Sequence, residues 1–176
     1  PYVKTYVEER ELTLVFLVDT SRSMDFGSRE LTKREVAAQF CALLAFVAQR
    51  QQDRGGLCLM GEEPGLHLEP QKGAGAVSRV VREVIAAPAA HGYADLQAAL
   101  ELQLSTLKRR ALLFLVSDFL GDPESLVDVL RRAGRRHELI AVRVVDPFEE
   151  ELPSAGIIHL QDLESGRHVE VDTRSK

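Results

Sequence analysis

The sequence predicts an α/β domain with a doubly wound, mostly parallel sheet, helices on both faces and one antiparallel strand at the sheet edge. Two runs, 12–18 and 111–117, are apolar over almost their whole length, as is typical of strands that are covered on both faces. Strand-like and helix-like segments alternate along the chain, which favours parallel strands joined by crossover helices. Near the middle, a turn rich in Gly and Pro at 61–65 separates two strand-like runs and predicts the antiparallel pair.

The first half of the chain supplies most of the expected sheet. Residues 3–7 predict a short lead-in strand, which the first apolar run follows. A capping box formed by Thr32 and Glu35 predicts the start of a helix that runs to about Gln51, with apolar residues at helical spacing. The remaining elements of this half are strands 55–60 and 66–69 and a helix, 74–86, that ends before Pro88.

Two helices of the second half have recognisable starts. Asp95 can cap one of them, and Asp122 followed by Pro123 provides the N-cap and first-turn proline of the other. The pattern also predicts two strands and a C-terminal β-hairpin whose turn contains a glycine. The ranges are helices 96–107 and 123–132, strands 111–117 and 138–145, and hairpin strands 157–160 and 168–171. Without a long linker or an internal repeat, the pattern predicts a single domain over residues 1–176.

The composition excludes several classes of protein. A chain of 176 residues with 45% hydrophobic and 28% charged residues suits one globular domain. A net charge of −5 argues against nucleic-acid binding, and the basic clusters at 108–110 and 131–136 are expected at the negative ends of helices. No apolar run approaches the ~20 residues needed to cross a bilayer, so we expect no membrane contact from these residues.

The cysteines indicate the cellular compartment, and the start of the chain indicates a longer parent protein. Cys41 and Cys58 each lie within an apolar pattern, so we expect two reduced core residues in a cytoplasmic protein. The chain begins at Pro1 on a charged segment, and we therefore expect a fragment of a longer protein.

Polar loops follow both apolar strands. Asp19, Ser21 and Ser23 stand at alternate positions after the first, and Asp118 follows the second. If the two strands are neighbours, ~4.8 Å apart, their carboxyl ends bring both carboxylates into one small volume. A divalent cation would relieve the repulsion between them, and the hydroxyls would complete an oxygen shell suited to Mg²⁺ or Mn²⁺. The alternative is a turn whose side chains only cap backbone N–H groups.

These residues carry a family resemblance. Asp19-x-Ser21-x-Ser23, with a later strand-end Asp118, resembles the metal-ion-dependent adhesion site of von Willebrand factor A domains. More narrowly, essentially the whole chain resembles the bacterial family of unknown function called DUF58. The segments that carry this similarity are Tyr2-Val3-Lys4, Glu8-Glu9-Arg10-Glu11-Leu12, Asp19-Thr20-Ser21-Arg22-Ser23-Met24, Phe26-Gly27, Val116-Ser117-Asp118-Phe119, Asp146-Pro147, Gly156 and Asp162-x-Glu164-Ser165-Gly166.

The resemblance implies a von Willebrand factor A-like, Rossmann-type fold with Mg²⁺ at the carboxyl end of the sheet. It also implies protein–protein contact, often beside MoxR-type AAA+ ATPases that mature or assemble other proteins. Full-length relatives commonly carry more sequence before this domain, sometimes with membrane helices. The resemblance therefore implies that the full-length form of this protein is anchored in a membrane.

One position departs from the adhesion-site pattern. Where relatives read Gly-x-Thr-Asp-Leu, this chain has Gly92-Tyr93-Ala94-Asp95-Leu96, and the Ala94 methyl group cannot ligate an ion. Asp95 then has two interpretations, a contact through water or the simpler helix cap. Arg22 and His91 are further candidates for the rim of the site, and Arg22 and Met24 are candidates for side chains that point outward.

Three functions follow from this pattern. The first is a non-catalytic interaction domain in which a weakly held Mg²⁺ or Mn²⁺ accepts an acidic side chain from a protein partner. The second is a metal-free binding scaffold with a degenerate site, which Ala94 favours. The third is a Mg²⁺-dependent, phosphatase-like hydrolase with Asp19 as nucleophile, although Ser21 stands where such enzymes usually place an acid/base Asp.

Overall fold

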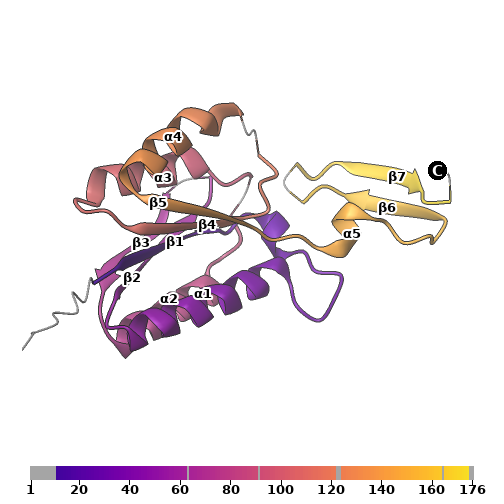
Figure 1. Cartoon of the computed structure of the whole chain (residues 1–176). Helices are drawn as coiled ribbons and strands as arrows, with labels where there is room; N and C mark the ends of the chain where they lie inside the picture. Colours follow the sequence, from indigo (N-terminus) through magenta and orange to yellow (C-terminus); the bar gives the residue numbers. More distant parts are fainter. Residues whose placement is uncertain (1–10, 63, 91, 122–123, 164, 175–176) are drawn as a thin grey trace, which may run out of the picture.

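The computed structural model describes residues 11–62, 64–90, 92–121, 124–163 and 165–174. Its centre is a five-stranded sheet of order β3-β2-β1-β4-β5 (Figure 1). Neighbouring strands are parallel except β2 and β3, so the predicted mostly parallel sheet with one antiparallel edge strand is confirmed. The strands are β1 (Thr13–Asp19), β2 (Arg54–Met60), β3 (Pro64–Gln71), β4 (Leu112–Ser117) and β5 (Glu138–Arg143).

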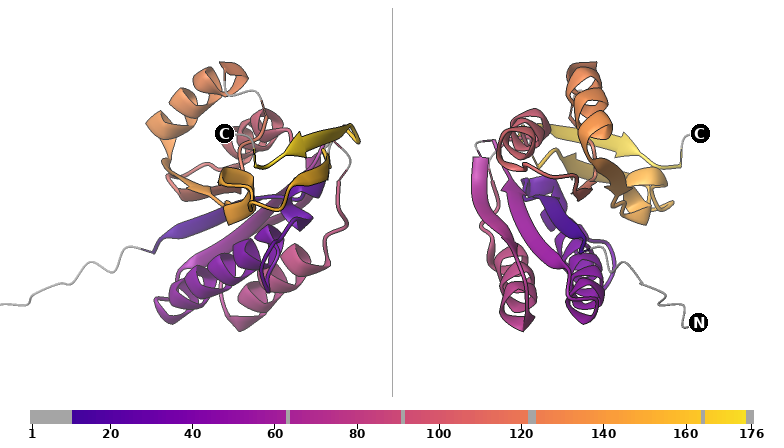
Figure 2. Two further views of the ribbon diagram at one scale, coloured as in Figure 1. Left: turned by 90° about the vertical axis from the view of Figure 1, so that its right-hand side faces the viewer. Right: turned by 60° about the vertical axis from the view of Figure 1, so that its left-hand side comes forward.

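Helices cover both faces of this sheet (Figures 1 and 2). Alternate residues of β1 point to opposite faces, so Phe16 lies in one buried cluster and Leu17 in the other. The first cluster receives α1 (Lys33–Arg50) and α2 (Ala74–Ala86), and the second receives α3 (Leu96–Thr106) and α4 (Val127–Arg136). The two apolar strands β1 and β4 are therefore buried on both sides, as their composition indicated.

Several predicted boundaries are confirmed and others move. The capping box at the start of α1 forms, because Thr32 Oγ1 accepts from Glu35 N at 3.2 Å and Glu35 Oε2 accepts from Thr32 N at 2.8 Å. The expected range of α2 is also confirmed. By contrast, β5 ends two residues earlier than expected, and the predicted lead-in strand at 3–7 lies outside the described residues.

The helix expected to end at Arg132 continues to Arg136, after a short 3₁₀ turn at Glu124–Leu126. Its proposed capping residues at 122–123 lie outside the described residues. The extension has a partner, because the Arg136 guanidinium donates to the carbonyls of Leu104 and Leu107 at the end of α3. Arg135 and Arg136 lie in the last turn of α4, as the charge pattern predicted, and Arg136 in addition bonds to the negative end of the neighbouring α3.

The C-terminal hairpin is also confirmed. Strands β6 (Ile157–Gln161) and β7 (His168–Asp172) form an antiparallel pair separate from the main sheet (Figure 1). Within the described ranges, no helix is both long enough and apolar enough to span a bilayer. Cys41 and Cys58 are free and buried, and burial raises their thiol pKa values to about 12 and about 11.

His137, the buried residue between α4 and β5, predicts a pH dependence of stability. Its Nδ1 accepts from Ala111 N at 3.3 Å, and burial, with nearby Arg136 and Arg110, lowers the pKa of the ring. The folded state thus favours the neutral ring. We expect the free energy of unfolding to fall as the pH drops below the ordinary value of 6.5 toward the lower folded pKa.

Urea denaturation at about pH 7.5 and about pH 5.5 measures this loss. The variant His137→Gln can accept the same hydrogen bond but takes no proton, so it should lose less stability over that interval. Equal losses in the two proteins would contradict the assignment to His137.

Candidate functional site

The two predicted strand-end loops meet. Strands β1 and β4 pair in parallel, with Val18 opposite Val116, so Asp19 and Ser117 lie at the same edge of the sheet. Ser117 Oγ donates to Asp19 Oδ2 at 2.6 Å across 98 residues of sequence. The expected neighbourhood of β1 and β4 is therefore confirmed, and Ser117 joins the site as a residue that the sequence had not singled out.

The loop after β1 gathers three side-chain oxygens. Asp19 Oδ1 accepts from Ser21 N at 2.8 Å and from Ser21 Oγ at 2.6 Å. Ser21 Oγ in turn lies 3.1 Å from Ser23 Oγ, and all three residues are buried. The loop thus caps a backbone N–H, as one interpretation held, and also clusters the oxygens that the other interpretation required.

The carboxyl group of Asp19 is held where a negative charge is unfavourable. Burial raises its pKa, the hydrogen bonds from Ser117 and Ser21 lower it in part, and the nearby charge of Asp118 raises it further. The net direction is upward. A cation close to this carboxylate would offset the cost of its burial.

The spacing of these oxygens can be compared with the ligand shell of a small divalent ion. Adjacent ligands of an octahedral Mg²⁺ lie ~3.0 Å apart when each bond is ~2.1 Å. The contacts Asp19–Ser21 and Ser21–Ser23 measure 2.6 and 3.1 Å, which are also ordinary hydrogen-bond lengths. No three His, Cys, Asp or Glu side chains converge within the described part of the chain. An ion here would therefore depend on serine hydroxyls.

Asp118 lies beside this cluster but already has a cationic partner. Its Oδ2 accepts from Lys33 Nζ at 2.8 Å, and its Oδ1 accepts from Leu120 N at 3.3 Å. Lys33 is only 2% exposed and also contacts Glu149 Oε1 at 2.5 Å. The repulsion between two strand-end carboxylates is thus relieved in part by the protein itself.

Sequence reasoning missed Lys33, although the chain carried a signal. Lys33 and Arg34 are the first two residues of α1, where the positive end of the helix dipole disfavours cations. Two basic residues in that place indicate nearby acceptors, and both side chains are buried against them.

Glu149 belongs to an acidic run, 149–151, that follows Asp146-Pro147. Asp146 caps a short helix, α5 (Pro147–Glu150), in which Glu149 faces Lys33. Asp146 Oδ1 accepts from Phe148 N at 2.9 Å, and its Oδ2 accepts from Ser28 N at 2.7 Å. Although burial opposes the ionised form, these hydrogen bonds lower the pKa of Asp146. The capping box between Asp146 and Glu149 therefore places the Glu149 carboxylate against Lys33.

Arg34 fastens the site loop to the rest of the domain. Its Nε lies 2.7 Å from Asp25 Oδ1, its Nη2 donates to Thr20 O at 3.1 Å, and its Nη1 donates to Ala87 O. Thr20 also bonds to β2, since its N and Oγ1 both donate to Met60 O. The loop that carries the oxygen cluster is therefore held by contacts from α1 and from β2.

The remaining candidates take separate places. Asp95 Oδ1 accepts from Ala98 N at 2.8 Å and caps α3, which confirms the simpler interpretation. Ala94 packs against the second core cluster, whereas Arg22 is exposed, as expected of a rim residue. Met24 is fully buried, so its predicted outward position is wrong, because a 3₁₀ turn at Arg22–Asp25 directs it into the core. His91 lies outside the described residues.

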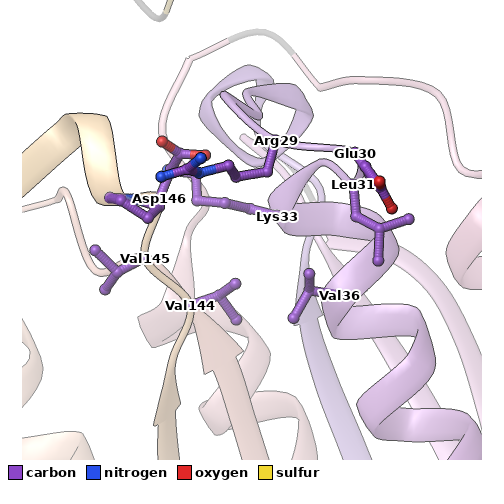
Figure 3. A pocket seen from close by; sticks show the side chains of 9 residues that line it. Arg29, Glu30, Leu31, Lys33, Val36, Val144, Val145 and Asp146 are labelled. Atoms are coloured by element: carbon purple, nitrogen blue, oxygen red, sulfur yellow. The ribbon is translucent and has the colours of Figure 1, made fainter. Parts of the chain in front are cut away.

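A groove of about 750 Å³ adjoins the site (Figure 3). It lies between the start of α1 and the segment after β5, and Val36 and Val144 project into it from opposite sides (Figure 3). Arg29, Lys33 and Asp146 gather at one end (Figure 3). Lys33 therefore links the groove to Asp118.

Comparison with known proteins identifies relatives across the whole chain. A family model described as "Protein of unknown function DUF58" matches residues 1–176. The uncharacterized protein Rv1480 of Mycobacterium tuberculosis is 32% identical over 168 residues, which cover 94% of this chain and 53% of the relative. The chain thus spans about half the length of the curated relatives it matches.

Solved structures show the same fold. An aerotolerance-related membrane protein from Bacteroides fragilis aligns with a TM-score of 0.67 and 12% identity, over 92% of this chain and 82% of that one. The SpRpn10 VWA domain aligns with a TM-score of 0.53 and 13% identity, over 77% and 90% respectively. At such identities the likeness concerns the fold, and the predicted von Willebrand factor A-like architecture is confirmed.

Proposed function

Because the chain belongs to the DUF58 family and has a von Willebrand factor A-like fold, we propose that it is a non-catalytic protein-interaction domain with a partial metal-ion-dependent adhesion site. The observation that carries this proposal is the oxygen cluster of Asp19, Ser21 and Ser23, joined to β4 through Ser117. Those three residues would hold Mg²⁺ or Mn²⁺, with Asp118 contributing directly or through water. When bound, the ion would supply a positive charge that accepts a carboxylate from the partner.

Two features of the site indicate that it would bind the ion weakly. Asp118 shares its charge with Lys33, and Ala94 offers no oxygen where relatives of the adhesion-site type have threonine. The hydroxyls of Ser21 and Ser23 are neutral, so one carboxylate carries most of the charge compensation. A weakly compensated ion favours an anionic partner group over water.

The hydrolase alternative receives less support from the geometry. Asp19 accepts three hydrogen bonds and is 3% exposed, so its carboxylate does not face a substrate as a nucleophile would. The side chain two positions on is Ser21, which donates to Asp19 rather than serving as an acid or base. A metal-free scaffold remains the second candidate, because Lys33 already neutralises Asp118.

Thermal unfolding with and without Mn²⁺ tests the proposed ion. At an ion concentration of 100 times Kd, wild type should gain about 2.7 kcal/mol, and its Tm should rise by roughly 5–10 °C. The variant Asp19→Ala should show no rise, whereas Asp128→Ala, in which an exposed carboxylate on α4 is removed, should respond like wild type. If saturating Mn²⁺ leaves the wild-type Tm unchanged, the bound ion is refuted and the metal-free scaffold is favoured.

We further propose that the partner presents its acidic side chain at this edge of the sheet. The family resemblance suggests a MoxR-type AAA+ ATPase as this partner. The present domain would then belong to a longer protein that is anchored in the membrane. The exposed Arg22 beside the buried cluster suits an acidic partner surface.

A further inference from the structure

The buried ammonium of Lys33 stands between two carboxylates from distant parts of the chain. Its Nζ lies 2.8 Å from Asp118 Oδ2 and 2.5 Å from Glu149 Oε1. Lys33 and Asp118 are 2% and 4% exposed, whereas Glu149 is 28% exposed. One partner of Lys33 thus belongs to the candidate ion site, and the other belongs to the helix α5 beside the groove.

We infer that Lys33 is an internal cation that competes with the divalent ion for Asp118 and couples ion binding to α5 through Glu149. This inference rests on the proposed function, since it concerns the regulation of the same site. In the absence of an ion, Lys33 neutralises Asp118, which otherwise would face Asp19 as an unpaired buried carboxylate. A divalent ion held by Asp19 and shared with Asp118 would repel the ammonium.

Lys33 has a second carboxylate partner, Glu149, so it can give up its contact with Asp118 without losing all charge compensation. A buried ammonium without a carboxylate is strongly unfavourable, but the flexible lysine stem lets the charge stay with Glu149 when Asp118 turns to the ion. Glu149 is the more exposed of the two carboxylates, so solvent can help to stabilise this second arrangement.

A movement of the Lys33 ammonium from Asp118 toward Glu149 would also affect the groove. Glu149 Oε2 also accepts from Asp146 N at 3.2 Å, and Asp146 holds Ser28 N ahead of α1. Lys33 and Asp146 both line the groove (Figure 3). A stronger hold of Lys33 on Glu149 would therefore alter the contacts of the segment that forms one groove wall.

Mn²⁺ affinity of three variants tests the competition, with Mn²⁺ alone as the probe and electron paramagnetic resonance of the free ion as the readout. Lys33→Met removes the competitor, so Mn²⁺ should bind about tenfold more tightly. Glu149→Gln removes the alternative partner and leaves Lys33 on Asp118, so Mn²⁺ should bind several-fold more weakly. Glu150→Gln is the matched control, because Glu150 is 62% exposed and faces Arg143, and its affinity should equal that of wild type.

The opposite signs of the two changes separate competition from a merely structural role. Binding that is equal in wild type, Lys33→Met and Glu149→Gln, yet lost in Asp19→Ala, would overturn the inference and leave the proposed function standing. Binding in none of them would overturn both. Binding that appears only in Lys33→Met and is lost on adding Asp19→Ala would support the competition and show that Lys33 fills the site. If Lys33→Met does not fold, the direction of change in Glu149→Gln decides.

Discussion

Replacement of Arg34 by methionine is expected to lower the free energy of unfolding by about 2–3 kcal/mol, because it removes the charged hydrogen bonds that the buried guanidinium donates to two backbone carbonyls. Arg34 is 6% exposed and binds Asp25 and the carbonyls of Thr20 and Ala87. Methionine keeps the apolar stem, but Ala87 O loses the guanidinium donor, whereas Thr20 O keeps its bond from Ala90 N and Asp25 remains open to solvent. The Tm should fall by at least about 4 °C, as measured by thermal unfolding.

Arg22 provides the control for that variant. It lies in the same loop but is exposed, so Arg22→Met should change stability by no more than about 0.5 kcal/mol. Similar stabilities of the two variants would show that the loop is held by its contacts with β2 rather than by Arg34. A large loss in Arg34→Met alone would establish the guanidinium as the support of the oxygen cluster.

Replacement of Gly27 by alanine is the second large expected effect. A Cβ at this position would lie 2.6 Å from the carbonyl oxygen of Leu31 and 2.8 Å from Thr32 Cα, so the backbone must move. The adjacent Phe26 O accepts from Lys33 N at 2.9 Å, and that bond anchors the start of α1. We expect a loss of about 1–3 kcal/mol in urea denaturation, as for other overpacked positions.

Gly134 offers the same substitution in open space. It lies within α4, and a Cβ there would meet no atom within 4 Å. Gly134→Ala should therefore stabilise the protein by about 0.5–1 kcal/mol, since alanine favours the helix. Equal effects of the two substitutions would contradict the steric argument at Gly27.

The order of strands and helices was predictable because it depends on local pattern. The apolar runs at β1 and β4 indicated strands buried on both faces, and the Thr32 capping box located the start of α1. Those two inferences needed only spacing and residue type. The meeting of Asp19 with the end of β4 was predicted only on the condition that the two strands are neighbours, and the sheet order meets that condition.

The missed parts depend on contacts between segments far apart in sequence. The partnership of Lys33 with Glu149 requires the position of α5, which residue spacing does not give. Met24 was misplaced because a loop sequence does not reveal a 3₁₀ turn that directs a side chain inward. The extension of α4 to Arg136 likewise depends on carbonyls at the end of α3.

The sequence separations within the site have a consequence for biosynthesis. The bonds Asp19–Ser117, Lys33–Asp118 and Lys33–Glu149 span 98, 85 and 116 residues. Contacts so distant in sequence form slowly, and none can form on a nascent chain before its later residues leave the ribosome. Asp19 is thus made early and buried late: its bond with Ser117 requires β4 to be in place, and the bond of Lys33 with Glu149 requires the chain as far as α5.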